Sequence, residues 1–364
     1  MPIDGISLAP WQLEQRTDFT GGENIRLVPG LVAKSQIILG QNCELSPEGL
    51  LRTRLGKRKL LTTPIGAGGV LGVWTFGTTA GTNYLIVHHG TSIYAGEWDG
   101  TSQDPTLTEI KTGLTANARF NVEVWKDNIF FANGNDAIFR FDGTTTTTLL
   151  DSPPLSYLVK VYEGRLYVVD AANPNLLRYS GLEDYDDWHG LNVINVRDGD
   201  GDEIKNILPV NGGMALVKTR NIFILYGTNK DNFKLNAMPA SGAAGATGYF
   251  SGNDGGIVLG RDSWFTVQTN GVKPVGITHS PLLQDMTLDQ LADTTAVAQK
   301  RYLRGYYLLG NGERTIVMMD GKSGAIFRWT GLDAGAIGVA DCEGFDDDIL
   351  IGDADEGTVY ILDN

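Results

Sequence analysis

Residues 122–143 read VEVWKDNIFFANGNDAIFRFDG. Three apolar runs, 122–125, 129–132 and 137–141, alternate with short polar stretches that are rich in Asn, Asp and Gly. The last run ends in Asp142-Gly143, where glycine permits the positive φ that a tight reversal requires. Strands separated by such turns form antiparallel hairpins, so this stretch predicts a small antiparallel sheet.

The same unit recurs from about residue 69 onward. Residues 84–100 end in Trp-Asp-Gly, residues 158–181 end in Tyr-Ser-Gly, and less regular units continue to residue 362. About seven units are present at a spacing of roughly forty residues, which is typical of propeller blades. The sequence therefore predicts an all-β fold, a β-propeller of six or seven four-stranded blades. A β-solenoid, with its shorter repeat, and a β-sandwich, with fewer hairpins, are the less favoured alternatives.

The first part of the chain lacks this period. We expect residues 1–64 to form an extended N-terminal arm with an entry strand, and residues 65–364 to form the propeller domain. A basic stretch ends the arm; its charged residues are Arg52, Arg54, Lys57, Arg58 and Lys59. Opposite charges orient docking, so these side chains should face either an acidic partner or the acidic body of the chain itself. The arm as a whole could equally wrap its own propeller.

Three smaller features complete the outline. The best helical candidate is 280–294, one short helix between blades. Cys43 and Cys342 lie in no metal-ligand spacing, which favours two buried free thiols over a single bridge. The opening MPIDGISLAPW has no signal-peptide pattern and no stretch has transmembrane length, so we expect a cytosolic protein without membrane insertion.

The charge distribution argues against tight nucleic-acid binding. The formal net charge of the chain is -14; residues 1–60 hold eight Lys/Arg and six Asp/Glu, so the remainder carries -16. An acidic body repels phosphates. DNA could still slide past such a surface.

The sequence gives little evidence of a catalytic motif. The histidines are His88, His89, His189 and His279; no G-x-S-x-G elbow accompanies them, and adjacent His88 and His89 should point to opposite faces of a strand. The sialidase Asp-box and the phosphate-binding loop are also missing. We therefore expect no enzymatic activity, no catalytic residue and no cofactor.

One acidic loop invites a metal hypothesis. Asp198, Asp200, Asp202 and Glu203 lie within six residues. The loop does not match the EF-hand template, which needs Gly at position six and Glu at position twelve. A solvated acidic turn is favoured, and a weak Ca²⁺ site at the three aspartates is the alternative.

Several stretches resemble tailed-phage virion proteins that have a propeller body. The resemblance is carried by FTGG at 19–22, NCELSPEG at 42–49, RTRLGKR at 52–58, YSGLEDYDDW at 179–188 and DGDGDEI at 198–204. It spans most of the chain, although each motif is built from turn and strand chemistry. It implies a nozzle-like or hub-like tail component in the virion, assembled in the host cytoplasm. The chain is shorter than podophage nozzle proteins, which leaves its position in the particle open.

The resemblance also implies partners. These are copies of the chain itself in a ring, other virion proteins such as a portal or adaptor, and DNA that passes without specific binding. Repulsion over a Debye length of about 8 Å would keep an acidic conduit wall from holding DNA. The candidate wall residues are Asp198, Asp200, Asp202, Glu203, Asp346, Asp347 and Asp348. A glycan-binding or host-receptor-binding propeller is the alternative function, and a polysaccharide-degrading propeller is a weaker one.

Overall fold

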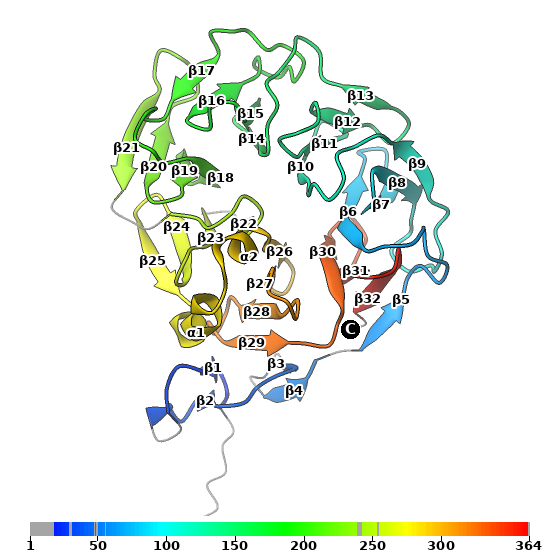
Figure 1. Cartoon of the computed structure of the whole chain (residues 1–364), viewed down its shortest axis with the longest axis vertical. Coiled ribbons are helices and arrows are strands. Elements are labelled where there is room, and N and C mark those ends of the chain that lie inside the picture. Colours follow the sequence, from blue (N-terminus) through cyan, green and yellow to red (C-terminus); the bar gives the residue numbers. More distant parts are fainter. Residues whose placement is uncertain are drawn as a thin grey trace, which may run out of the picture.

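Seven four-stranded antiparallel sheets succeed one another around a closed ring in the computed structural model of the chain (Figure 1). The structure describes residues 18–28, 31–46, 48, 50–54, 56–238, 242–252 and 255–362. Each sheet is one blade, whose strands step outward from the axis of the ring to its rim. The fold is therefore the all-β propeller that the repeat predicts, with seven blades.

Four strands make up each blade. In order from blade 1 to blade 7, the innermost strands are β6 (Val70–Gly77), β10 (Asn121–Trp125), β14 (Val159–Tyr162), β18 (Ile204–Val210), β22 (Tyr249–Gly252), β26 (Thr295–Gln299) and β30 (Ala334–Ala340). The second strands are β7 (Asn83–His89), β11 (Asn128–Ala132), β15 (Arg165–Val169), β19 (Gly213–Lys218), β23 (Gly255–Leu259), β27 (Arg304–Leu308) and β31 (Asp348–Asp353).

The outer half of each blade follows in the same order. The third strands are β8 (Ser92–Glu97), β12 (Phe139–Phe141), β16 (Leu176–Tyr179), β20 (Ile222–Tyr226), β24 (Trp264–Gln268), β28 (Ile316–Asp320) and β32 (Val359–Leu362). The outermost strands are β9 (Thr108–Lys111), β13 (Thr146–Thr148), β17 (Val193–Asn195), β21 (Lys234–Met238), β25 (Gly271–Val275), β29 (Ile326–Trp329) and, in blade 7, β5 (Lys57–Lys59).

The hydrophobic core lies between neighbouring blades. In β11, Phe130 and Phe131 are both fully buried, yet they point to opposite faces of the sheet. Phe131 packs with Phe76 of blade 1, and Phe130 packs with Leu166 of blade 3. Because a blade is covered on both faces, its middle strands read as continuous apolar runs and not as alternating ones.

The turn after the third strand is fixed by its Asp-Gly pair. The Asp142 carboxylate accepts hydrogen bonds from the backbone N–H groups of Thr144 and Thr145, at 2.9 and 2.7 Å. Gly143 follows with φ 91°, a conformation that a residue with a Cβ rarely adopts. The Asp99 turn of blade 1 is built in the same way. These turns explain the regular spacing of the repeat.

The ring is closed by a strand from the other end of the chain. In blade 7, β5 pairs antiparallel with β32, so that Lys57 lies opposite Leu362 and Lys59 lies opposite Tyr360. This pairing joins the first blade-forming residues to the last ones and covers the edge that β32 would otherwise expose. The expected boundary at residue 64 therefore falls too late, because the propeller includes β5.

The rest of the N-terminal segment, meaning the described residues of 18–54, lies against the rim of blade 6 (Figure 1). It contains β1 (Gly22–Glu23) paired with β2 (Gln36–Ile37), and β3 (Cys43–Leu45) paired with β4 (Leu51–Thr53). The segment is attached to β29 by hydrogen bonds from Asn42 N to Arg328 O at 2.7 Å and from Trp329 Nε1 to Cys43 O at 2.9 Å. The described part of the arm thus wraps its own propeller.

A buried carboxylate fastens this segment. Glu23 is fully buried and receives two hydrogen bonds of 2.8 Å from the Arg328 guanidinium, in the bidentate geometry that strengthens such pairs. His279 Nε2 lies 3.2 Å from the same carboxylate, and Gly40 N donates to it at 3.0 Å. Burial alone would raise the pKa of Glu23, but these donors outweigh burial and bring the pKa to about 2. Glu23 is therefore ionised across the physiological range.

Two short helices replace the single helix expected over 280–294. They are α1 (Ser280–Gln284), preceded by the 3₁₀ turn η2 (Ile277–His279), and α2 (Leu288–Ala292). The break occurs because Thr287 starts a new helix: its side chain accepts from Gln290 N, and the Gln290 side chain accepts from Thr287 N. Neither helix, nor any other among the described residues, could cross a bilayer.

Both cysteines are free thiols, as the sequence favours, although Cys43 and Cys342 are half-buried and not fully enclosed. Burial raises the pKa of Cys342 to about 11. His88 and His89 also follow expectation, since His88 is fully buried against Phe120 while His89 is partly exposed.

Candidate functional site

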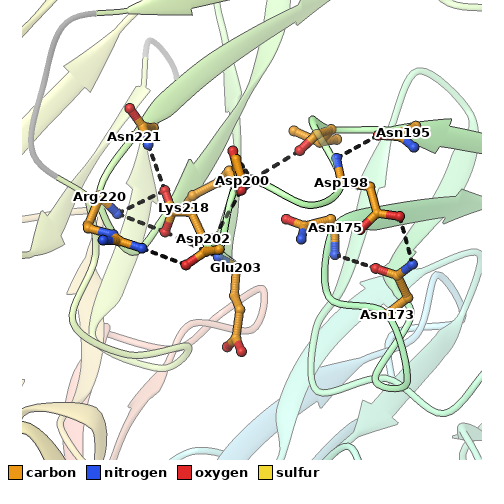
Figure 2. A network of polar contacts seen from close by, with 12 residues as sticks. Asn173, Asn175, Asn195, Asp198, Asp200, Asp202, Glu203, Lys218, Arg220 and Asn221 are labelled. Atoms are coloured by element: carbon orange, nitrogen blue, oxygen red, sulfur yellow. Dashed lines mark hydrogen bonds and ion pairs between the residues drawn. The ribbon is translucent and has the colours of Figure 1, made fainter.

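The acidic residues of the 198–203 loop take part in a network of polar contacts (Figure 2). The loop connects blade 3 to blade 4, and both Asp200 carboxylate oxygens lie 2.7 Å from Nζ of Lys218. Lys218 is the last residue of β19, its side chain is fully buried, and its ammonium also donates to Val196 O at 3.1 Å. Although burial acts to raise it, the pKa of Asp200 is lowered overall by the Lys218 contact.

The other aspartates of this loop face different donors. Asp202 accepts from Arg220 N at 3.0 Å and from the Asn221 amide at 2.8 Å, while Asp198 accepts from the Asn173 amide at 3.3 Å (Figure 2). The three carboxylates do not converge, and no group of metal ligands occurs among the described residues. The ammonium of Lys218 occupies the position beside Asp200 where a bound cation would lie.

The second set of candidate conduit acids lies on the connection between β30 and β31. Asp346 forms an ion pair with Arg301, and the Asp347 carboxylate accepts from Arg301 N at 2.6 Å. Gln299 donates to the Asp347 carbonyl at 2.6 Å, and Asp348 begins β31. These acids tie blade 7 to blade 6. Neither they nor the residues of the 198–203 loop are among the residues that line the axial cavities described below.

The basic stretch at the end of the N-terminal segment makes its contacts within the chain. Its described partners are Glu44 for Arg52 (2.6 Å), the Asn42 side chain for Arg54 (3.0 Å), the Leu332 carbonyl for Lys57 (2.9 Å), Ile361 across the sheet for Arg58, and Glu356 for Lys59 (3.9 Å). Lys57 also lies over the ring of Tyr360, 4.3 Å from its centroid. Lys57 and Lys59 thus contact the propeller, whereas Arg52 contacts a residue of the N-terminal segment itself.

A cavity lies along the axis of the propeller. This cavity, of about 510 Å³, is lined by innermost strands from most of the blades and by residues that precede them. Its charged lining residues are Arg119, Glu123, Lys160, Lys300 and Asp341. The axis therefore carries both signs of charge, with one more cation than anion.

A buried ion pair crosses from blade 2 to blade 3 inside this cavity. Lys160 Nζ of β14 lies 2.6 Å from the Glu123 carboxylate of β10, and both side chains are largely buried. Burial by itself lowers the pKa of Lys160, but the nearby Glu123 carboxylate more than compensates and raises it. Asn121 adds a second link by accepting from Val159 N at 2.9 Å. The pair holds two neighbouring innermost strands together.

A smaller cavity of about 240 Å³ adjoins the first at one mouth of the axis. The two cavities share Leu71 and Arg119. The polar side chains that line the smaller one are His89, Asn117, Arg119 and Arg314, and no acidic residue is among its lining residues. His89 Nε2 faces the Gly68 carbonyl at 3.0 Å and donates to it.

Arg119 connects elements that are far apart in the sequence. Its Nε lies 2.7 Å from Asp293, which follows α2, and its Nη1 donates at 3.0 Å to Leu71 O of blade 1 and to Gly335 O of blade 7. Arg314, from the β27–β28 connection, lies 2.6 Å from the other Asp293 oxygen. One guanidinium thus ties blades 1 and 7, the two blades that meet at the closure, to the connection that enters blade 6.

Replacing Arg119 with methionine should lower the free energy of unfolding by about 2–3 kcal/mol, because two backbone carbonyls and Asp293 lose a charged donor. Urea denaturation of both proteins measures this. Arg301→Met is the matched control, since the exposed Arg301–Asp346 pair is screened by solvent and should contribute little to stability. Equal losses in the two variants would contradict a closing role for Arg119.

Sequence reasoning did not identify these axial residues. Glu123 and Lys160 are each the single charged residue at the centre of an apolar innermost strand, in NVEVW and LVKVY. This shared position in two successive repeats is the signal that could have shown the pair. Arg119, Asp293 and Arg314 lie outside the strands, where the sequence offers no comparable pattern.

No protein-family model matches the chain, and no curated protein sequence matches it. Solved propeller structures do. Virginiamycin B lyase from Staphylococcus aureus superposes with a TM-score of 0.55 at 12% identity, covering 85% of this chain and 98% of the lyase. The Pan2 WD40 domain of Neurospora crassa gives a TM-score of 0.51 at 11% identity, covering 86% and 95%. The N-terminal domain of Nup159 gives 0.52 at 10% identity, covering 88% and 97%. These likenesses show the propeller fold alone.

Proposed function

We propose that this propeller is a structural component of a multi-subunit assembly of the tailed-phage kind. In this proposal the propeller is a rigid body, and the N-terminal segment supplies the surface that contacts the next subunit. The sequence motifs that resemble phage virion proteins support the proposal. So does the distribution of exposed apolar side chains, which is its main support.

Exposed large apolar residues concentrate on the N-terminal segment. Of fourteen such residues among the described ones, six lie between residues 27 and 50: Leu27, Val28, Leu31, Ile38, Leu39 and Leu50. Leu31 and Leu39 are 69% and 74% exposed. The remaining eight are distributed over positions 124–303. Such a concentration on one short segment is typical of an interaction surface.

The segment is also held in place. The buried Glu23–Arg328 pair and the β3–β29 contacts fix it on blade 6, so the exposed apolar side chains do not reach the core of their own propeller. A fixed surface loses little conformational entropy on binding. The geometry is therefore that of a preformed contact and not of a loose tail.

A second copy of the chain is the partner that this surface fits best. The apolar side chains lie beside the exposed cations Arg26 and Lys34. Beyond residue 60 the chain carries a net charge of -16, so another copy offers an acidic surface to these cations. Contacts between the segment of one copy and the body of the next would be head-to-tail, which generates a ring if the rotation closes.

The double variant Leu31→Ser with Leu39→Ser should reduce self-association without unfolding the propeller, because both side chains are exposed. Light scattering across a range of concentrations measures the oligomeric mass. The matched control is Leu182→Ser with Leu191→Ser, two leucines of blade 3 that are 63% and 78% exposed. The control should associate as the unmodified protein does.

Two results would contradict a self-assembling ring. One is a protein that stays monomeric at every concentration. If incorporation of this monomer into particles still depends on Leu31 and Leu39, the partner of the surface is a different virion protein. The other is equal loss of association in both double variants.

The acidic body also predicts that assembled rings do not retain duplex DNA at physiological salt, which a gel-shift assay tests.

A further inference from the structure

The smaller axial cavity differs electrostatically from the molecule that surrounds it. The chain has 43 Asp and Glu residues and a net charge of -14, yet this cavity is lined by two arginines, one histidine and no acid. Asp293 lies behind Arg119 and Arg314 and contacts both, so the local charge of the three groups is +1. A positive hollow in an acidic protein concentrates small anions.

The two guanidiniums keep donors available. Among the described residues, the side-chain contacts of Arg119 use Nε and Nη1, and the contact of Arg314 uses Nη1. Nη2 of Arg119 and both Nε and Nη2 of Arg314 remain for a ligand. Asp293 fixes both groups at one mouth of the axis, with contacts of 2.7 and 2.6 Å. Planar guanidinium groups fixed in this way match the geometry of carboxylate and phosphate oxygens.

The backbone around the cavity leaves room for a ligand. Gly68 and Gly90 line it, and a Cβ added to either would meet no atom within 4 Å. Both have positive φ, 97° and 61°, which glycine adopts without strain. Asn117 adds an amide side chain to the same lining. The lining of the cavity is therefore open beside these two glycines.

We propose that the smaller axial cavity binds a compact oxyanion, a carboxylate or phosphate group, through Arg314 and Arg119. Arg314 is the specific ligand group, because its one side-chain contact is with Asp293. Arg119 would contact the anion as well, and it also ties blades 1 and 7 together. Occupation by an anion would neutralise the remaining positive charge and stiffen the mouth of the axis, independently of any contact through the N-terminal segment.

Isothermal titration calorimetry on the full chain at low ionic strength tests this, with inorganic phosphate and citrate as separate probes. Saturable one-to-one binding of at least one probe is expected, weakening as salt is added. Arg314→Gln should raise the Kd by about tenfold or more, because one charged fork is lost. Arg314→Lys should give an intermediate Kd, since it keeps the charge and loses the planar fork.

Lys300→Gln is the control, because Lys300 is an exposed cation that lines the larger axial cavity but not the smaller one. Its Kd should equal that of the unmodified protein. Binding of phosphate alone or of citrate alone supports the site and identifies which oxyanion it takes. Absence of binding for both probes, an unchanged Kd in Arg314→Gln, or an equal loss in Lys300→Gln would each overturn the proposal. Circular dichroism confirms that each variant is folded.

Discussion

Glu23→Gln is expected to lower the free energy of unfolding by about 3–5 kcal/mol, the cost of breaking a buried ion pair by removing one partner. The glutamine would leave the Arg328 guanidinium without its counter-charge and would present an NH₂ group to donors. Urea denaturation measures the loss. Glu97→Gln, at an exposed position at the end of β8, is the control and should change stability by about 0.5 kcal/mol or less.

The same pair predicts an acid dependence. The pKa of Glu23 is about 2 in the folded protein, against an ordinary value of 4.5 for a glutamate carboxyl. A depressed folded pKa means that the stabilisation is fully present above pH 4.5 and is lost as the pH falls toward 2. The unmodified protein should therefore lose more stability than Glu23→Gln over this interval. Parallel stability curves for the two proteins would contradict the assignment.

Loss of the pair should also be visible locally. Arg26 and Lys34 are exposed trypsin sites on the N-terminal segment, which Glu23 fastens to blade 6. In Glu23→Gln, cleavage at these sites should become faster than in the unmodified protein, before the propeller itself is digested. Unchanged cleavage would mean that the β3–β29 contacts alone hold the segment.

Asp200→Asn should be comparably damaging, with a loss of about 3–5 kcal/mol, because it leaves the fully buried ammonium of Lys218 without a counter-charge. Lys218→Met should lose less, about 1–2 kcal/mol, since the abandoned Asp200 carboxylate is 28% exposed and can be hydrated. The double variant should be more stable than Asp200→Asn alone. This double-mutant cycle, measured by urea denaturation, gives the coupling energy of the pair.

Asp198→Asn is the control for this cycle and should change stability by about 0.5 kcal/mol or less, because Asp198 is exposed. Additive losses in the double variant would show that Lys218 and Asp200 do not interact energetically. Added Ca²⁺ should leave the Tm of the unmodified protein unchanged, since Lys218 already neutralises Asp200. A rise in Tm with Ca²⁺ would restore the metal hypothesis for the acidic loop.

The repeat predicted the propeller because its signal is local. The second and third strands of a blade are buried on both faces, and runs such as NIFFA and FRF mark them clearly. The outermost strands were harder to see. The Thr146–Thr148 strand and Val193–Asn195 have only three residues each and are partly exposed, so they differ little from the turns beside them.

The candidate site shows the limit of sequence reasoning more sharply. Asp198 to Glu203 stood out because the acids are close in sequence, yet the structure pairs Asp200 with Lys218 and Asp202 with Arg220 and Asn221, while Asp198 contacts Asn173 and Glu203 contacts Lys205. Arg119 and Asp293 are 174 positions apart and meet because the ring closes. Contacts of that kind depend on the number of blades and their register, which no local pattern specifies. The sequence likewise does not show that the apolar side chains of the N-terminal segment are exposed, because their exposure depends on how the segment lies against blade 6.

Closure by β5 has a consequence for how the protein is made. The partner strand of Lys57–Lys59 is Val359–Leu362, which is translated about 300 residues later. At synthesis rates of about 5–20 residues per second, the first strand waits roughly 15–60 s for its neighbour. Throughout that interval the growing chain is an open arc with an unpaired edge at each end. The arrival of β32 therefore decides when the nascent propeller stops being a substrate for chaperones and for unwanted pairing with other chains.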